Sequence, residues 1–246
     1  MDNPTQLYGS DDEMVAPCNR WGLRVCHDVV RIGQEIGIDE AGRGPLLGPV
    51  FAAAVVLGDG PLLEFDGLKD SKRFSSRRRL AKVAEHVMAY AKGWAVAQVS
   101  AADIDAMNIR KATHRAMHCA ARECMSVCAL HVCGLETQKP FLLVDGTDFT
   151  PITYLDSDAL RVVPHMCVPK GDNTYCAIAA ASILAKHARD DYIDSLVEAD
   201  PTLDERYGIS RNKGYGTKEH IDGLRRYGPS EYHRLSFKVK GNSQGA

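Results

Sequence analysis

The sequence predicts an α/β fold, because it combines a buried strand, long segments with helical periodicity and an ordinary globular composition. Val50–Leu57 is a continuous apolar run without charge, which is typical of a strand buried on both faces. Asn108–Val127 instead carries apolar residues at helical spacing. The chain has 246 residues, 45% hydrophobic and 25% charged, enough for one α/β domain with an appendage or for two small domains.

The most informative segment is residues 37–49, which read GIDEAGRGPLLGP. A predicted strand runs into two adjacent carboxylates, Asp39 and Glu40, and a glycine-rich turn follows. Neighbouring strand residues point to opposite faces, so both acids can serve one site only where the strand ends or bends, which the glycines permit. Paired carboxylates of this kind suit Mg²⁺ or Mn²⁺. A charged surface turn would have the same composition, whereas a dinucleotide-binding loop lacks its third glycine and its helix.

Two further acids follow apolar runs. Phe141–Gly146 places Asp145 directly after three apolar residues, and the predicted strand Arg161–Val168 leads to Asp172 just before a helix. Taken alone, Asp145 fits an ordinary turn and Asp172 fits a helix N-cap. The repetition of an acid at the end of a buried strand indicates a shared site.

The remaining elements are predicted from periodicity and capping residues. Asp190 and Asp191 lie about four turns into the last long helix, so Asp190 is expected to be structural, in a salt bridge. The other expected elements are a helix capped by Ser71, Ser75 or Ser76 that runs through Val87, a strand at Trp94–Val99, a turn or short helix at Ala101–Asp105, a helix at Thr174–Val197 and a short helix with Arg225 and Arg226.

Composition excludes several classes of protein. No apolar run reaches the ~18–20 residues of a membrane span, and the acidic N-terminus has no signal-peptide pattern, so a cytoplasmic protein is expected. The eight cysteines are therefore expected to be reduced thiols. Four of them are spread around a helix rather than paired as zinc ligands: Cys119, Cys124, Cys128 and Cys133.

Charge is distributed unevenly along the chain. The net charge is −2, but residues 205–246 contain nine Arg or Lys and four Asp or Glu, a net of +5. Aromatic residues, among them Tyr215, lie between these basic residues, which suits stacking on a sugar or base beside phosphates. A solvated helical cap with tyrosines in its turns explains the same pattern.

The motifs taken together resemble the ribonuclease HII family, the bacterial type 2 ribonucleases H. The resemblance covers Gly33–Phe237 and rests on GIDEAGRGPLLGPV, LKDSK, LLVDG, KGDNTY with AAASILAKHARD, and NKGYGT with YGPSEYHRLSF, in that order. It implies an RNase H-like fold, a mixed five-stranded sheet flanked by helices with a small helical C-terminal appendage. The implied organisation is an extension at 1–32, a catalytic domain at 33–200 and a helical region at 201–246.

The resemblance also implies roles for individual residues. Those that match the metal-binding and catalytic carboxylates are Asp39, Glu40, Asp145 and Asp172. Gly42, Arg43 and Gly44 match the turn that contacts a ribonucleotide 2′-OH, and Tyr215 matches the tyrosine that stacks on the next sugar. The positions implied to contact the nucleic-acid backbone are Lys69, Ser71, Lys72 and Asn108, with Arg110, Lys111 and His114 beside the last.

The implied activity is hydrolysis of the RNA strand of RNA/DNA hybrids and cleavage 5′ of single ribonucleotides in duplex DNA. Two ions of Mg²⁺ or Mn²⁺ would act, leaving 3′-OH and 5′-phosphate ends. The expected partner is nucleic acid, with no membrane and no obligate protein partner, and the protein is expected to be a monomer. The C-terminus shows no Q-x-x-hydrophobic-aromatic motif for binding a sliding clamp.

Two alternatives stay open at this point. A type 3 ribonuclease H shares the chemistry but has an additional N-terminal domain, for which this chain has too few residues, and usually has Lys where this chain has Arg43. A catalytically silent nucleic-acid-binding module of the same fold is the second alternative. Four carboxylates at one site would weaken phosphate binding by such a module.

Overall fold

The structure is a computed structural model that describes residues 18, 22–27, 34–58, 68, 76–130, 139–156 and 158–238. Lys69, Ser71, Lys72 and Cys133 lie outside the described residues. The elements in chain order are β1 Glu35–Ala41, β2 Val50–Val56, α1 Arg77–Tyr90, β3 Gly93–Val99, α2 Ala101–Met107, α3 Ile109–Val127, β4 Phe141–Asp145, β5 Thr153–Asp156, β6 Ala159–Val162, β7 His165–Val168, the 3₁₀ helix η5 Gly171–Asn173, α4 Cys176–Ala199, α5 Thr202–Tyr207, α6 Ile209–Asn212 and α7 Lys218–Tyr227.

The central sheet has five strands in the order β3-β2-β1-β4-β7. β1 is antiparallel to β2, and β2 is antiparallel to β3, whereas β1, β4 and β7 run parallel to one another. This mixed five-stranded sheet confirms the predicted fold class. The carboxyl ends of β1, β4 and β7 meet at one edge of the sheet, where α/β proteins commonly bind their ligands.

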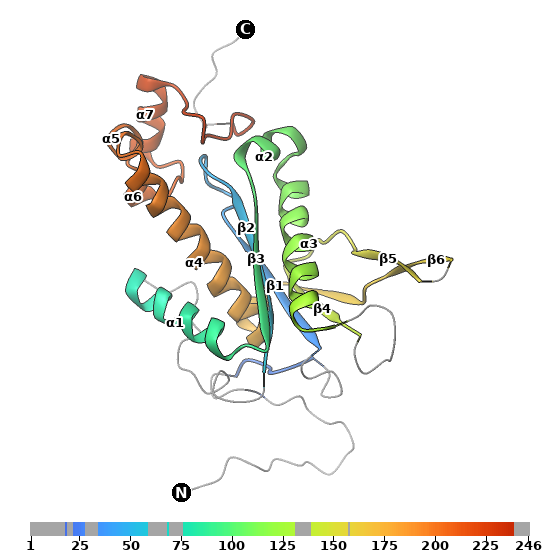
Figure 1. Ribbon diagram of the computed structural model, residues 1–246. Coiled ribbons are helices and arrows are strands. Elements are labelled where there is room, and N and C mark those ends of the chain that lie inside the picture. The colour runs from blue at the N-terminus through green and yellow to red at the C-terminus, as the bar shows by residue number, and fades with distance from the viewer. Residues whose placement is uncertain are drawn as a thin grey trace, which may run out of the picture.

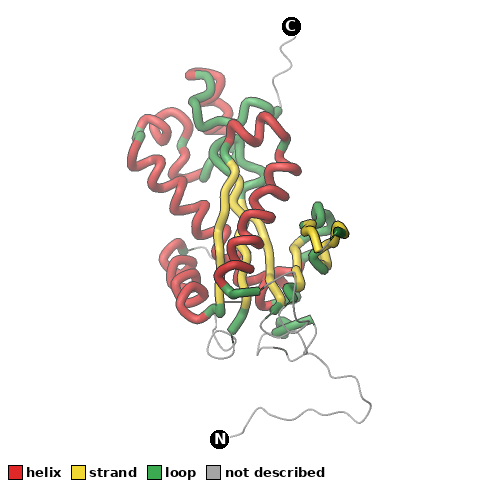
Figure 2. The backbone as a smooth tube through the Cα atoms, turned by 45° about the vertical axis from the view of Figure 1, so that its right-hand side comes forward, coloured by secondary structure: helices red, strands yellow, loops and turns green. Residues whose placement is uncertain are grey.

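Helices cover both faces of the sheet (Figure 1). In β2, Ala52 and Ala54 pack in one core with α3, while Ala53 and Val55 pack in the other core with α1 and α4. All seven residues of β2 are buried, which explains a strand without polar alternation. Figure 2 shows the same layers, with strands between helices.

The alanine-rich start of α4 lies directly against β1. A Cβ added at Gly37 would be 2.1 Å from the carbonyl carbon of Ala177, so only glycine fits there. Ala179, Ala180 and Ala181 of the same helix are also buried. The small side chains bring α4 close to the strand that carries Asp39 and Glu40.

The short helices α5, α6 and α7 follow α4 and form the predicted helical appendage (Figure 1). Their core includes Tyr207 and Ile209 and is joined by Leu47 from the loop after β1. The loop beside the acids is therefore packed against the C-terminal part of the chain.

The prediction of one strand over Arg161–Val168 is wrong. The segment forms β6 and β7, separated by Val163 and Pro164, because proline has no N–H for a strand hydrogen bond. β6 pairs with β5 in a separate two-stranded sheet that projects away from the central sheet (Figure 1, Figure 2). Leu155 and Leu160 of this hairpin are exposed, so the sequence does not show the pattern of a strand with one buried face.

The predictions for α1 and for Asp190 agree with the structure. α1 begins directly after Ser76, although the Ser76 side chain makes no capping hydrogen bond. Asp190 accepts a hydrogen bond from Lys186 at 3.1 Å, which is the expected salt bridge. The seven described cysteines are free thiols, and no described helix is both long and apolar enough to cross a membrane.

Candidate active site

The predicted acids lie at the carboxyl edge of the three parallel strands. Ile38 of β1 pairs with Val144 of β4, so Asp39 and Asp145 each follow directly at the same level of the sheet. Asp145 in turn pairs with Val168, the last residue of β7, and η5 with Asp172 begins three residues later. Three segments far apart in the sequence thus bring their acids to the same edge of the sheet.

The acids approach this edge from both faces of the sheet. Ile36 and Ile38 pack on the α3 side, so Asp39 points with Gly37 toward α4, where the Ser182 side chain hydrogen-bonds it. Glu40 points the opposite way. β1 runs on to Ala41, so the strand does not end at the acid pair as expected. The Glu40 N–H donates to Asp39 Oδ1 at 2.7 Å, which joins the two residues.

Burial and mutual repulsion perturb the acid pair. Asp39 is 5% exposed, and its burial, followed by the charges of Glu40 and Asp145, raises its pKa well above the usual value. Burial also raises the pKa of Glu40, although Arg43, whose Nη1 lies 3.2 Å from Glu40 Oε1, opposes the shift. These couplings show that Asp39, Glu40 and Asp145 share one electrostatic environment.

The other two acids are oriented by backbone and amide donors. Gly171 N–H donates to Asp145 Oδ1 at 2.6 Å, and Asn173 Nδ2 donates to Asp172 Oδ1 at 2.9 Å. Asp172 is 3% exposed and belongs to η5, whereas the N-cap of α4 is Tyr175. Asp172 is therefore not the cap of the long helix.

The donor set fits a divalent cation. All four candidates offer hard carboxylate oxygens, and a cation would relieve the repulsion that raises the pKa of Asp39. Within the described residues, however, no three Asp, Glu, His or Cys side chains already converge as ligands of one ion. The strands bring the acids to one edge of the sheet, where they would hold the cation.

The glycine-rich turn and Tyr215 lie next to each other beside the acids. A Cβ at Gly44 would be 3.5 Å from the Tyr215 ring, and the Leu46 N–H donates to the Gly214 carbonyl at 2.8 Å. Gly42 has φ +93, and a side chain there would collide with Arg189. The structure thus brings together the turn and the tyrosine, for which the resemblance implies contacts with consecutive sugars.

Two buried arginines contact the glycine-rich turn and the segment around Tyr215. The Arg189 guanidinium lies 5.5 Å from the centre of the Tyr215 ring, and its Nη2 donates to the Lys213 carbonyl at 2.6 Å. Arg234 donates to the carbonyls of Gly42, Arg43 and Gly48 at 2.6, 3.0 and 2.8 Å. Both residues are only 3% exposed; Arg234 holds the glycine-rich turn, and Arg189 holds the segment just before Tyr215.

A basic cavity of about 430 Å³ opens beside the acids. Its lining runs from Glu40 and Gly42 across α4 to the segment around Tyr215. The cations in the lining outnumber its acids, Glu40 and Asp190; they are Lys186, Arg189, Arg211 and Lys213. A positively charged hollow beside a carboxylate cluster suits a phosphodiester backbone.

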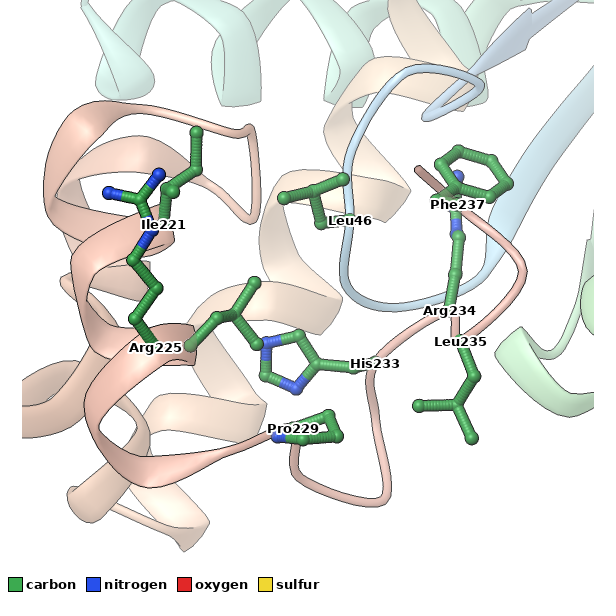
Figure 3. A pocket seen from close by; sticks show the side chains of 9 residues that line it. Leu46, Ile221, Arg225, Pro229, His233, Arg234, Leu235 and Phe237 are labelled. Atoms are coloured by element: carbon green, nitrogen blue, oxygen red, sulfur yellow. The ribbon is translucent and has the colours of Figure 1, made fainter. Parts of the chain in front are cut away.

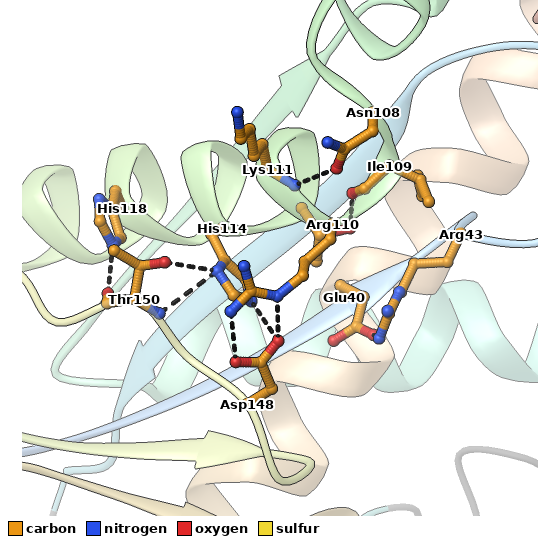
Figure 4. Close-up of polar contacts among 11 residues, drawn as sticks. Glu40, Arg43, Asn108, Ile109, Arg110, Lys111, His114, His118, Asp148 and Thr150 are labelled. Atoms are coloured by element: carbon orange, nitrogen blue, oxygen red, sulfur yellow. Dashed lines mark hydrogen bonds and ion pairs between the residues drawn. The ribbon is translucent and has the colours of Figure 1, made fainter. Parts of the chain in front are cut away.

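Side-chain hydrogen bonds join α3 to its N-cap and to the loop after β4 on this side of the site (Figure 4). Asn108 has φ 77 and caps α3, because its Oδ1 accepts from the Lys111 N–H at 3.1 Å. Arg110 donates two hydrogen bonds to Asp148, at 2.5 and 2.7 Å. Arg110 is therefore held by a carboxylate in the loop after β4, and this loop is joined to α3 again where His114 Nδ1 meets Thr150 Oγ1 at 2.8 Å.

A second cavity, of about 230 Å³, lies between α7 and the C-terminal segment (Figure 3). Leu46, Ile221 and Phe237 are among its lining residues, and the lining contains no carboxylate. Without an acid it cannot be the metal site.

Sequence reasoning missed Ser182, Arg189, Arg234 and Asp148. A signal existed for the first two, because Ser182, Lys186 and Arg189 are spaced by four and three residues and form one polar stripe that begins in the apolar first half of the helix. Arg234 and Asp148 lie in loops, where no periodicity marks a residue.

Fold and site define an RNase H-like nuclease, and comparison with known proteins agrees. The model of the family Ribonuclease HII matches residues 36–240. A ribonuclease HII of Chromohalobacter salexigens is 44% identical over 201 residues, 82% of this chain and 87% of that protein. One of Ruegeria sp. is 45% identical over 202 residues, 82% of this chain and 76% of that protein. The chain belongs to the ribonuclease HII family and is a metal-dependent endoribonuclease of the ribonuclease H type.

Solved structures support the same fold. The ribonuclease HII in a PCNA complex from Archaeoglobus fulgidus aligns with TM-score 0.56 and 24% identity, over 82% of this chain and 92% of that one. A Bst-RNase HIII in complex with Mn²⁺ aligns with TM-score 0.55 and 20% identity, over 80% and 71%.

Proposed function

We propose that the protein hydrolyses the RNA strand of RNA/DNA hybrids and also cuts 5′ of single ribonucleotides embedded in duplex DNA. The observation that supports this most is the meeting of Asp39, Glu40 and Asp145 at one sheet edge, beside a loop that contacts Tyr215. The acids alone would support only the hydrolysis of a phosphodiester. The adjoining loop supports discrimination between a ribose and a deoxyribose at the cut.

Asp39, Glu40, Asp145 and Asp172 are the proposed ligands of two divalent ions, Mg²⁺ or Mn²⁺. Bound ions supply an activated water and neutralise charge on the leaving oxygen. In-line displacement by water at the phosphorus would leave a 3′-OH and a 5′-phosphate. Gly171 orients Asp145 through its N–H, and Ser182 orients Asp39, so the chain itself fixes two of the carboxylates.

Substrate choice is assigned to the loop and the tyrosine. The 2′-OH is the group that distinguishes RNA from DNA at one residue. Gly42 and Gly44 leave room for a sugar to approach the backbone, Arg43 is exposed, and the Tyr215 ring is 49% exposed beside Gly44. The loop would contact the 2′-OH and the ring would stack on the following deoxyribose.

The backbone of the nucleic acid would follow the basic cavity. Lys186 and Lys213 line it on one side of the acids, and Lys111 and Asn108 lie at the start of α3 on the other. Lys69, Ser71 and Lys72 stay candidates for phosphate contact. All proposed contacts come from one chain, so we expect the monomer to be active. Size-exclusion chromatography with light scattering during turnover tests this.

The deciding experiment uses a 5′-labelled DNA duplex with one ribonucleotide, incubated with Mg²⁺, Mn²⁺ or EDTA. We expect one cut on the 5′ side of the ribonucleotide, with metal only. Extension of one product by a DNA polymerase reports its 3′-OH, and ligation of the other reports its 5′-phosphate. Cleavage of long hybrids but never of this duplex would refute the single-ribonucleotide activity, and cleavage in EDTA would refute the metal mechanism.

A further inference from the structure

Two buried histidines form a pair beneath the proposed substrate loop. His220 lies in the first turn of α7 and is 0% exposed, and His233 lies in the C-terminal segment and is 4% exposed. Their Nε2 atoms are 3.0 Å apart, and their ring centres are 5.2 Å apart. Figure 3 shows the His233 side chain pointing from the C-terminal segment toward α7.

The partners of the two rings determine which nitrogens carry hydrogen. His220 Nδ1 lies 3.0 Å from the Tyr215 carbonyl, which can only accept, so Nδ1 must donate. In the neutral ring His220 Nε2 then accepts, and His233 Nε2 donates to it. His233 Nδ1 accepts from the Ser230 N–H at 2.9 Å. The hydrogen bonds therefore run in one direction, from Ser230 through both rings to Tyr215.

The surroundings keep the pair neutral. Burial lowers the pKa of both histidines, and that of His233 falls to about 4, with the neighbouring His220 adding to the shift. The Tyr207 ring packs against both, with ring centres 5.9 Å from His220 and 4.8 Å from His233. Arg234 is the next residue along the chain.

The segments that carry the two histidines both contact the substrate loop. On the side of His220, the Tyr215 carbonyl is bonded while the Tyr215 ring lies beside Gly44. On the other side, His233 forms an antiparallel bridge with Leu47, and the Arg234 N–H donates to the Leu46 carbonyl at 2.8 Å. The pair thus links the two parts that are proposed to read consecutive sugars.

We propose that His220 is a positioning residue, whose Nδ1–H fixes the Tyr215 carbonyl so that the ring faces Gly44 and favours a ribonucleotide followed by a deoxyribonucleotide. This inference rests on the proposed function, because it assigns Tyr215 to the sugar after the ribonucleotide. It differs from a packing role in one respect: the hydrogen bond to Tyr215 matters more than the volume of the imidazole.

Two variants of His220 separate these roles. In His220→Asn the amide Nδ2 takes the place of Nδ1 and can still donate to the Tyr215 carbonyl. In His220→Gln the longer side chain puts Oε1 where Nε2 was, so it can accept from His233 but no longer donates to Tyr215. Both replace an aromatic ring with an amide, so they are matched in chemical type.

The measured quantity is the ratio of kcat/KM on a duplex with one ribonucleotide to kcat/KM on an RNA/DNA hybrid. We expect His220→Gln to lower this ratio roughly five- to tenfold, the range for loss of one hydrogen bond, and His220→Asn to stay within about twofold of the wild type. Equal ratios in the two variants, whether both normal or both reduced, would overturn the inference.

Two controls distinguish this inference from the proposed function. A wild type that never cuts the single-ribonucleotide duplex contradicts the function itself. A wild type that cuts it, with a ratio lowered by Tyr215→Ala but not by His220→Gln, contradicts only the inference. If thermal melting shows that the His220 variants do not fold, two variants of His233 replace them. His233→Gln keeps a donor toward His220, whereas His233→Leu removes it. The inference then requires that His233→Leu lowers the ratio and His233→Gln does not.

Discussion

Arg234 Nη2 donates to the carbonyl of Gly42 at 2.6 Å and so joins two residues that are 192 positions apart in the sequence. The same guanidinium reaches Arg43 and Gly48, so one buried side chain bonds three carbonyls of the loop beside the acids. Burial lowers the pKa of Arg234 to about 10, which still leaves it charged at neutral pH. The shape of the loop therefore depends on the last part of the described chain.

Arg234→Lys should destabilise the protein, because a single ammonium cannot reach three carbonyls in a fixed plane. We expect the free energy of unfolding to fall by about 2–4 kcal/mol, since buried carbonyls lose their donors. Urea unfolding followed by circular dichroism measures the change. The exposed Arg226→Lys is the matched control and should stay within about 0.5 kcal/mol of the wild type. Equal effects would show that Arg234 does not fix the loop.

Asp145→Asn should abolish cleavage while the fold remains. The amide oxygen can still accept from the Gly171 N–H, and the lost charge reduces repulsion with Asp39. We expect activity in Mg²⁺ to drop more than about a hundredfold, beyond the loss seen when a residue merely supports a metal ligand. The Tm should be unchanged or rise by up to about 4 °C. Activity near the wild-type level would remove Asp145 from the proposed ligands.

Tyr215→Ala should reduce cleavage at a single ribonucleotide more than cleavage of an RNA/DNA hybrid. Stacking on an aromatic ring contributes about 1–3 kcal/mol, which corresponds to roughly five- to 150-fold. Tyr227→Ala is the control, because Tyr227 is 47% exposed and Tyr215 is 49% exposed, and both belong to the basic C-terminal region. The measurement is kcat/KM of each variant on the two substrates. An equal loss of kcat/KM on both would assign Tyr215 to general binding.

The two glycines Gly37 and Gly44 should respond differently to alanine. A Cβ at Gly37 would meet the Ala177 backbone at 2.1 Å, so Gly37→Ala should cost about 3 kcal/mol or more of stability. A Cβ at Gly44 would meet the Tyr215 ring at an ordinary 3.5 Å, so Gly44→Ala should change stability by at most about 0.5 kcal/mol. It should nevertheless reduce cleavage, because the methyl group occupies space for the sugar. A Gly44→Ala enzyme with full activity on the single-ribonucleotide duplex would contradict this.

Metal binding should tighten as pH rises. The raised pKa values of Asp39 and Glu40 mean that the metal-free site holds protons at a pH where free carboxylates do not, and a cation must displace them. The folding stability of the metal-free protein changes in the opposite direction. Because the pKa values are raised in the folded state, their contribution to stability is fully present below the unfolded pKa near 4 and is lost as pH rises through the folded pKa values. Calorimetric Mn²⁺ titrations in buffers of different ionisation enthalpy measure the released protons. Binding without proton release would contradict the coupling.

The sequence predicted the acids better than the residues that orient them. Asp39 and Asp145 follow apolar runs of sequence, so their place could be inferred because parallel strands end at the same edge of a sheet. Arg234 and Asp148 could not be inferred in this way, because their partners are backbone carbonyls and a helix residue that only the folded chain brings near. The hairpin β5–β6 was missed since its exposed apolar residues face no core, and hydrophobic patterning detects strands through burial.

Asn108 illustrates a different limit. The resemblance implies a backbone contact, and the structure shows its side-chain oxygen engaged as the cap of α3 at a positive φ. An asparagine can cap a helix through Oδ1 while its amide N–H groups face outward, so the two roles are compatible, but residue type alone could not reveal the first.

The contacts of Arg234 also bear on the order in which a ribosome produces this molecule. Residues 39–172, which include all four carboxylates, leave the exit tunnel well before Arg234 and Tyr215. A nascent chain at that stage has the acids but neither the donor that shapes the loop at Gly42 nor the ring beside Gly44. The parts proposed to choose a sugar are thus complete only near the end of synthesis, and fragments that end between residues 172 and 215 lack the Tyr215 ring while they retain all four acids.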